Sequence, residues 1–224
     1  MKTILALETS TEIASVALLH NNEQKSVELS GVNTHSHGLI PAIHELLEAF
    51  KIDLSKVELI AYGCGPGAFT GVRTACGVVQ GIAYGLDIPV VAIGSLHSQA
   101  EAAFEQQVID ECICILDARM GEVYWTHLKR QNGGWIELVP QSLARMDEVR
   151  AYVDQTRLPV VCGTQLEWQG TPSAVLAMPH AKYSLNIADR ATSAQYVIAQ
   201  EAQPVYLRNK VALTTAERLH AKSE

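Results

Sequence analysis

Apolar residues in the first half of the chain follow two spacings, one typical of strands and one typical of helices. Alternating or continuous apolar runs predict three strands at residues 2–7, 13–20 and 24–29, joined by short polar turns. The pattern then predicts a helix at 36–50, a strand at 57–62, a helix at 70–85, a strand at 88–93 and a helix at 95–104. An antiparallel meander is therefore followed by alternating helices and strands.

The second half opens like the first, at an offset of 109 residues: residues 4–7 and Glu8 align with 113–116 and Asp117. Further elements are expected at 122–128, 135–139, 146–155 and 159–162, with an irregular stretch at 165–189 and a last helix near 193–201. This duplicated α/β pattern predicts a two-lobe ribonuclease-H-like fold, as in actin, hsp70 and sugar kinases, with a degenerate second lobe. The predicted domains are residues 1–104, 105–206 and a C-terminal tail at 207–224.

Composition narrows the class of protein. Hydrophobic residues make up 48% and charged residues 18% of the 224 residues, which excludes a fibrous or disordered chain. A net charge of −7 disfavours nucleic-acid binding by the chain alone, since that affinity depends mainly on Lys and Arg. The N-terminal apolar run is too short for a signal peptide, and Asp87 and Pro89 interrupt the least charged stretch, so we expect a cytoplasmic protein without a membrane span. The five cysteines are expected to be reduced core thiols.

Two loops at strand ends are candidate ligand sites. An acid and hydroxyls after the first strand position a metal-bound water or a nucleotide phosphate in this architecture, although an ordinary hydrogen-bonded turn explains them more simply. The glycine-rich loop at 63–71 opens a helix and offers backbone N–H groups to an anion, but it lacks the Lys-Ser/Thr pair of a phosphate loop. The nucleotide- or phosphate-proximal candidates are Glu8, Thr9, Ser10, Gly65, Gly67 and Asp117.

Neither a metal site nor a catalytic residue is predicted. His35 and His37 are two residues apart, whereas ligands on one helical face are three or four apart. We therefore expect these histidines to lie at a solvated helix start.

Gly77, Gly81 and Gly85 recur at four-residue spacing in a predicted helix. Each costs about 1 kcal/mol relative to alanine, so close packing should offset the loss, against either the chain's own sheet or a helix of a second subunit. Because the 70–85 helix is apolar around much more than one stripe, we expect it to form the main protein–protein surface together with the 36–50 helix. The predicted interface residues are Leu39, Ile43, His44, Leu47, Val72, Arg73, Gly77, Val78, Gly81 and Gly85.

Five segments in register carry a resemblance to a known family. They are residues 4–11 (ILALETST), 65–73 (GPGAFTGVR), 81–85 (GIAYG), 117–124 (DARMGEVY) and 204–208 (PVYLR). Together they resemble the bacterial TsaB (YeaZ) family over nearly the whole chain. The chain departs from the paralogous TsaD pattern, because it lacks the His-x-x-x-His pair that binds the TsaD metal, and Glu8 stands where Asp is usual in the wider superfamily.

The resemblance implies an accessory, non-catalytic subunit. Such a subunit is required for threonylcarbamoyl transfer to the adenosine 3′ of the anticodon, in tRNAs that read codons beginning with adenine. The implied partners are TsaD and TsaE, with a homodimer when the chain is alone and with tRNA contacted only indirectly.

Two alternatives belong to other classes. One is a small ATPase or kinase in which Glu8 and Asp117 hold Mg-ATP. The other is a metalloprotease, which the sequence disfavours because it contains no His-Glu-x-x-His motif. No cofactor is expected for the chain alone, and ATP or ADP with Mg²⁺ is expected only for the assembly with the partner.

Overall fold

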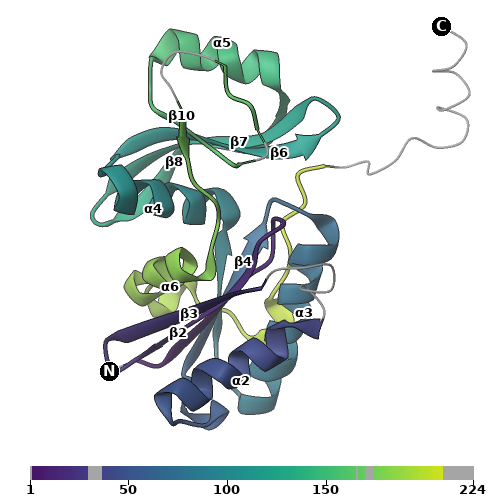
Figure 1. Ribbon diagram of the computed structural model, residues 1–224, viewed down its shortest axis with the longest axis vertical. Coiled ribbons are helices and arrows are strands. Elements are labelled where there is room, and N and C mark those ends of the chain that lie inside the picture. Colours follow the sequence, from purple (N-terminus) through teal and green to yellow (C-terminus); the bar gives the residue numbers. More distant parts are fainter. Residues whose placement is uncertain (1, 30–36, 165, 170–173, 209–224) are drawn as a thin grey trace, which may run out of the picture.

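The computed structural model describes residues 2–29, 37–164, 166–169 and 174–208, which form two five-stranded mixed sheets (Figure 1). The first sheet consists of β1 (Ile4–Glu8), β2 (Ala14–His20), β3 (Glu23–Leu29), β4 (Leu59–Gly65) and β5 (Val90–Gly94). The second consists of β6 (Glu111–Arg119), β7 (Glu122–Gln131), β8 (Gly134–Arg145), β9 (Val160–Cys162) and β10 (Ala174–Leu176). Strand orders β3-β2-β1-β4-β5 and β8-β7-β6-β9-β10 are equivalent, which confirms the duplicated ribonuclease-H-like α/β fold.

The helices of the first half lie close to where the apolar spacing predicts them. The helical elements are α2 (Leu39–Phe50), η1 (Leu54–Lys56), α3 (Phe69–Leu86), α4 (Ser95–Gln107), α5 (Met146–Thr156), α6 (Ala181–Arg190), η2 (Ser193–Gln195) and η3 (Ala199–Glu201). The expected start of the first helix at residue 36 lies outside the described residues. Two expectations for the second half are wrong: helix α6 falls within the stretch expected to be irregular, and two short 3-10 helices replace the helix expected at 193–201.

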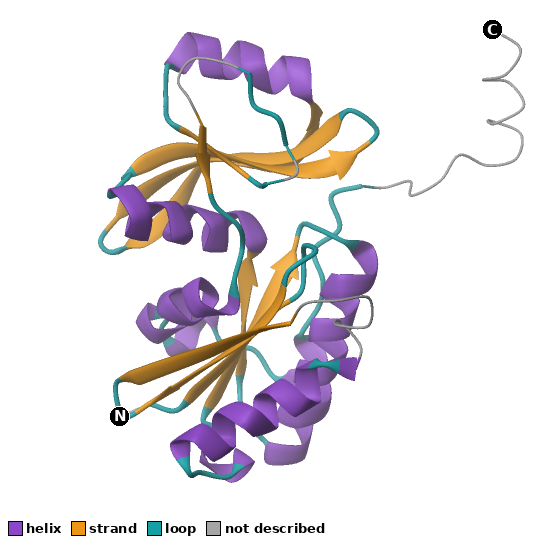
Figure 2. Ribbon diagram, in the orientation of Figure 1, coloured by secondary structure: helices purple, strands orange, loops and turns teal. Residues whose placement is uncertain are grey.

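Both faces of the first sheet are covered by helices (Figure 2). Alternate residues of β1 point to opposite faces, because side chains along a strand alternate in direction. Leu5 and Leu7 pack in the cluster formed with α2 and α3, whereas Ile4 and Ala6 pack in the cluster formed with α6. Strand β1 is therefore buried on both sides, consistent with its continuous apolar run.

Helices α4 and α6 each pack on the sheet of the other half of the chain. Helix α4 precedes the second sheet in sequence and places Leu96, Ala100 and Ala103 in one cluster with residues of β6, β7 and β9. Helix α6 follows the second sheet and contributes Leu185 and Ala188 to the core beneath the first. The division into domains at residue 104 remains a prediction. Helices α4 and α6 pack across this division, because each contacts the sheet formed by the other half of the chain.

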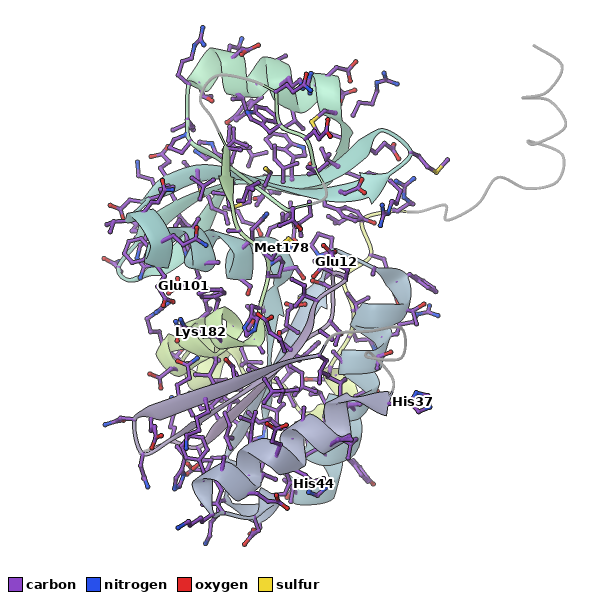
Figure 3. The ribbon with its side chains drawn as sticks, in the orientation of Figure 1. Glu12, His37, His44, Glu101, Met178 and Lys182 are labelled. Carbon is purple, nitrogen blue, oxygen red and sulfur yellow. The ribbon has the colours of Figure 1, made fainter. Side chains whose placement is uncertain are left out.

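A buried carboxylate links the two halves of the molecule. Glu101 on α4 is 4% exposed and contacts Arg190 Nη2 at the end of α6 at 2.7 Å. The same carboxylate accepts hydrogen bonds from Arg130 Nη1 at 2.9 Å and Trp135 Nε1 at 2.8 Å, both in the second sheet. Figure 3 shows Glu101 and the labelled Lys182 of α6 on the same side of the molecule, where Lys182 Nζ pairs with Glu105.

All five cysteines are buried and free, as expected for core thiols. Cys112 and Cys114 share one face of β6, with their sulfur atoms 3.7 Å apart. Among the described residues, no helix has the length and apolar content needed to cross a membrane.

Replacing Glu101 by alanine is expected to lower the free energy of unfolding by about 2 to 4 kcal/mol, because two guanidinium groups then lose their buried partner. The measurement is urea denaturation followed by circular dichroism. Glu148→Ala, at an exposed position of α5, serves as the control and should change the free energy by less than about 0.5 kcal/mol. Equal stability of the Glu101→Ala variant and the wild type would contradict the proposed link.

Candidate functional site

A cavity of about 440 Å³ lies between the two sheets. Loops after β1 and β4 form one wall, the end of β6 forms the opposite wall, and residues 205–208 close one side. The labelled side chains of Glu12 and Met178 lie at this level of the molecule in Figure 3. The lining residues are Ser10, Thr11, Glu12, Gly67, Ala68, Phe69, Leu116, Asp117, Ala118, Arg119, Met120, Tyr124, Gly163, Leu166, Met178, Val205, Tyr206, Leu207 and Arg208.

The structure brings only part of the predicted phosphate site to this cavity. Ser10, Gly67 and Asp117 line it, although they are far apart in sequence. Thr9 and Gly65 are buried and do not line the cavity. The predicted site is therefore divided between the cavity wall and the interior behind it.

Glu8 is fully buried and lies outside the cavity lining. Its Oε1 accepts a hydrogen bond from the Ser10 backbone N–H at 2.7 Å, whereas Oε2 has no hydrogen-bond partner among the described residues. Glycine at position 63 leaves room for the Glu8 carboxylate, which a methyl group there would overlap. Burial raises the pKa of Glu8 above its usual value, with the Ser10 hydrogen bonds opposing that shift.

The glycine-rich loop is closed by backbone contacts with the turn that follows β1. Ala68 N–H donates to the Ser10 carbonyl oxygen at 2.6 Å, and Thr9 Oγ1 donates to the Gly71 carbonyl oxygen at 2.7 Å. Methyl groups at Gly67 and Gly71 would overlap the backbone of Ser10 and Thr9 respectively. These glycines are consequently explained by the close approach of two backbones, without a bound anion.

Asp117 lines the cavity near the end of β6, just before three consecutive residues with positive φ. Its Oδ1 accepts from the Arg119 backbone N–H at 2.8 Å, and its Oδ2 is 3.0 Å from Arg119 Nη1. Arg119 and Met120 have φ values of 66° and 60°. The only charge facing Asp117 at ion-pair distance among the described residues is therefore its own neighbour, Arg119.

Sequence reasoning did not assign a site role to the C-terminal segment that reaches across the cavity. Val205 N–H donates to the Cys64 carbonyl oxygen at 2.7 Å in the first half of the chain. Arg208 Nη2 donates to the Ala118 carbonyl oxygen at 2.9 Å and pairs with Glu122 at 2.6 Å in the second half. Leu207 and Arg208 belong to the predicted tail, whose residues 209–224 lie outside the described residues. The signal for this segment in the sequence is the PVYLR motif at 204–208, but the spacing of its residues does not indicate that it contacts the cavity.

Helix α3 presents its glycine stripe to solvent. A methyl group built at Gly77, Gly81 or Gly85 would meet no atom of the described residues within 4 Å, and all three glycines are exposed. The alternative in which the stripe packs on the chain's own sheet is therefore wrong. Positions 75, 79 and 83 of the same helix are buried and face the sheet instead.

Four of the predicted interface residues belong to the core of the chain. Leu39, Ile43 and Leu47 of α2 and Val72 of α3 are each no more than 4% exposed. This part of the prediction is wrong, because the apolar stripe of each helix packs against the first sheet and is buried there. Val78 is half-buried and packs against that core.

The exposed part of the predicted interface combines the glycine stripe with aromatic and cationic groups. Arg73 stacks over the Phe69 ring at 3.8 Å and donates from Nε to Tyr206 Oη at 2.6 Å. Tyr84 is 71% exposed at the other end of the helix. Ile40 and His44 are exposed on neighbouring α2, and the labelled His44 extends from that helix in Figure 3.

The histidines near the start of α2 do not form a site that the structure describes. His37 is exposed, and residue 35 lies outside the described residues. Across the described ranges, no three residues of the types His, Cys, Asp and Glu are grouped closely enough to hold a metal ion.

Replacing Glu8 by glutamine is expected to raise the melting temperature near neutral pH. A buried acid with a raised pKa stabilises the fold below its unfolded pKa and loses that contribution as pH rises through the folded pKa. The gain should therefore be largest at neutral and alkaline pH and should shrink towards the unfolded pKa of about 4.3.

Differential scanning calorimetry across that pH range provides the measurement. Glu45→Gln, at an exposed position on α2, is the matched control and should follow the wild-type curve. A constant difference between Glu8→Gln and wild type at every pH would contradict the assignment of a raised pKa.

Comparison with known proteins identifies the family. The family model described as TsaD, tRNA N6-adenosine threonylcarbamoyltransferase, matches residues 19–205. "tRNA threonylcarbamoyladenosine biosynthesis protein TsaB" from Haemophilus influenzae is 34% identical, covering 93% of this chain and 94% of that protein. The Escherichia coli protein of the same name is 32% identical, covering 93% and 96%. The structure of YeaZ from Pseudomonas aeruginosa is 36% identical with a TM-score of 0.83, covering 92% of this chain and 100% of that one. The chain thus belongs to the TsaB (YeaZ) family, within the broader family that the TsaD model describes.

Proposed function

We propose that this protein is an accessory, non-catalytic subunit in the biosynthesis of threonylcarbamoyladenosine in tRNA. The names of the H. influenzae and E. coli relatives place those proteins in this pathway, and each alignment covers nearly the whole chain. The modified nucleoside is then the adenosine 3′ of the anticodon, in tRNAs that read codons beginning with adenine. Contact with tRNA is indirect, consistent with the net charge of −7.

The arrangement of the polar groups supports an accessory role. The Glu8 carboxylate is enclosed behind the cavity, and Asp117 is paired with Arg119. No nucleophile–base pair contacts the cavity among the described lining residues. The chemistry of the transfer is therefore assigned to a catalytic partner of the TsaD family, which acts together with TsaE.

The observation that carries the proposal is the exposed glycine stripe of α3. Three glycines at four-residue spacing weaken a helix by about 1 kcal/mol each relative to alanine, and no contact among the described residues offsets this cost. Small residues allow the backbone of a second helix to approach closely. We infer that a helix of the TsaD-type partner lies on this stripe and also covers Tyr84 of α3 and the exposed Ile40 and His44 of α2. A stable contact of this kind buries about 1,200 to 2,000 Å² in total.

Nucleotide binding in the cavity between the sheets is a second candidate function. The observation in its favour is that Ser10, Gly67 and Asp117 converge on one cavity. A magnesium ion held between Glu8 and Asp117 does not fit, because the Glu8 carboxylate is sealed against Gly63. In this candidate, Asp117 and Arg119 recognise the nucleotide without Glu8.

Replacing Gly81 by leucine is expected to weaken binding to the TsaD homologue at least about 30-fold, because a bulky side chain at the centre of a helix contact costs about 2 kcal/mol or more. The fold should be retained, since the side chain enters open space. Isothermal titration calorimetry measures the affinity, and far-ultraviolet circular dichroism checks the fold.

The matched control is Ala151→Leu, an equally bulky change at an exposed position on α5. It should leave the affinity within about twofold of wild type. Unchanged affinity of Gly81→Leu would overturn the assignment of the surface. Transfer of threonylcarbamoyl to tRNA by the purified chain alone would overturn the accessory role.

Gly81→Ala gives a test that needs no partner. It is expected to raise the free energy of unfolding of the chain by about 0.5 to 1 kcal/mol, since alanine favours the helix and its methyl group meets no atom. Gly71→Ala should instead destabilise the chain, because its methyl group would overlap the Thr9 carbonyl oxygen. Urea denaturation distinguishes the two, and destabilisation by Gly81→Ala would show that the stripe is packed.

Titration of the chain with ATP and Mg²⁺ tests the second candidate. Binding below about 1 mM that is lost in Asp117→Asn would support a nucleotide site in the cavity. Glu12→Gln, on the opposite wall of the cavity, serves as the control. Absence of heat at millimolar nucleotide would remove this candidate.

A further inference from the structure

A groove of about 790 Å³ runs beside the C-terminal end of α3. One side is the end of that helix with the residues that lead into β5, and the other is the segment that contains η3. It is separate from the cavity between the sheets and shares no lining residue with it. The lining residues are Ala83, Tyr84, Asp87, Ile88, Pro89, Tyr196, Val197, Ile198, Ala199, Gln200 and Glu201.

The groove adjoins the glycine stripe. Cys76 Sγ and Gln80 Nε2 both donate to the Ala202 carbonyl oxygen, at 3.1 Å and 2.9 Å. That row of α3, continued by Tyr84, therefore faces the segment containing η3. Gly77, Gly81 and Gly85 each follow one residue later, so the stripe forms the next row around the helix. A partner seated on the stripe consequently meets the rim of the groove.

Apolar side chains form part of the floor and of the rim of the groove. Ala83 and Ala199 are buried beneath it, and backbone hydrogen bonds join Val197 to Val90 at 2.9 Å in both directions. At the rim, Tyr84 is 71% and Ile198 is 59% exposed. A small ligand within the groove would leave much of these two side chains in water, whereas a protein segment laid across it covers both.

Two carboxylates give the groove a negative charge. Asp87 and Glu201 both line it, and neither has an ion-pair partner within the described ranges. Lys2 Nζ donates a hydrogen bond to Oη of the lining residue Tyr196 at 3.2 Å but forms no ion pair with Asp87 or Glu201. Asp87 caps the C-terminus of α3, where the helix dipole disfavours an anion. A cation supplied from outside would offset that cost.

We propose that the groove binds a segment of the partner protein that carries a lysine or arginine beside an apolar side chain. The apolar side chain packs between Tyr84 and Ile198, and the cation lies against Asp87 and Glu201. This inference rests on the proposed partner-binding function and extends its surface from the stripe to the groove. The partner is recognised here by charge complementarity as well as by close helix packing.

The first experiment uses a fluorescein-labelled peptide of alternating lysine and leucine as the probe, with fluorescence anisotropy. The double variant Asp87→Asn/Glu201→Gln is expected to bind at least about fivefold more weakly than wild type at low salt. The double variant Asp154→Asn/Glu148→Gln removes the same charge from exposed positions of α5 and should bind within about twofold of wild type. Equal losses in both variants, or no binding to wild type, would overturn the proposal.

The second experiment measures the affinity of the same variants for the purified TsaD homologue. A loss in Asp87→Asn/Glu201→Gln, with a shallower salt dependence than wild type, supports the groove as part of the partner surface. Loss in Gly81→Leu with no change in the groove variant would overturn the groove and leave the proposed function standing. If wild type does not bind the homologue, the proposed function fails, and the peptide measurement still decides whether the groove binds a basic segment.

Discussion

A close backbone contact at the first turn of α3 sets the direction of the faces of that helix. Gly71 lies against the Thr9 carbonyl oxygen at a distance that no side chain permits, and Thr9 Oγ1 returns a hydrogen bond to Gly71. With Gly71 turned inward, the buried positions 75, 79 and 83 follow at helical spacing. Residues two positions later, at 77, 81 and 85, must then point away from the sheet. One contact thereby closes the glycine-rich loop and exposes the glycine stripe.

The same contact explains why only some of the residues predicted to lie near a phosphate reach the cavity. The glycine-rich loop holds the turn after β1 in place. That turn encloses the Glu8 side chain, which lies opposite Gly63. Asp117 is the counterpart of Glu8 in the second half but remains at the cavity wall beside Arg119. The two sheets thus have equivalent strand orders, whereas Glu8 is buried and Asp117 lines the cavity.

Contacts on two sides join the halves of the molecule across the cavity. On one side, helices α4 and α6 each pack on the sheet of the other half, and Glu101 and Arg190 form an ion pair between these helices. On the other side, Arg208 of the C-terminal segment forms an ion pair with Glu122. Hydrogen bonds between Ser98 and His180 reinforce the first side. These links hold the first sheet, with helix α3 on it, and the second sheet in one arrangement.

The sequence was sufficient to predict most of the fold of the first half, because its strands and helices have clear apolar periods. The pattern also identified the repeat through Glu8 and Asp117, and it singled out the glycine stripe. It did not find α6, whose small and polar residues pack against the other half of the chain through non-local contacts. Nor could it separate the buried Leu39, Ile43, Leu47 and Val72 from the exposed positions of the same helices, because periodicity predicts an apolar face without showing what covers it.

Hydroxyl-radical footprinting of the chain, with and without the TsaD homologue, tests most directly whether α3 is the partner-binding surface. Tyr84, next to Gly85 on α3, is 71% exposed and Ile40 of α2 is 46% exposed, and both should be oxidised more slowly in the complex. Val108 and Leu176, which are 70% and 57% exposed elsewhere, serve as internal references and should react at unchanged rates. Protection of the reference residues with no protection of Tyr84 would contradict the account.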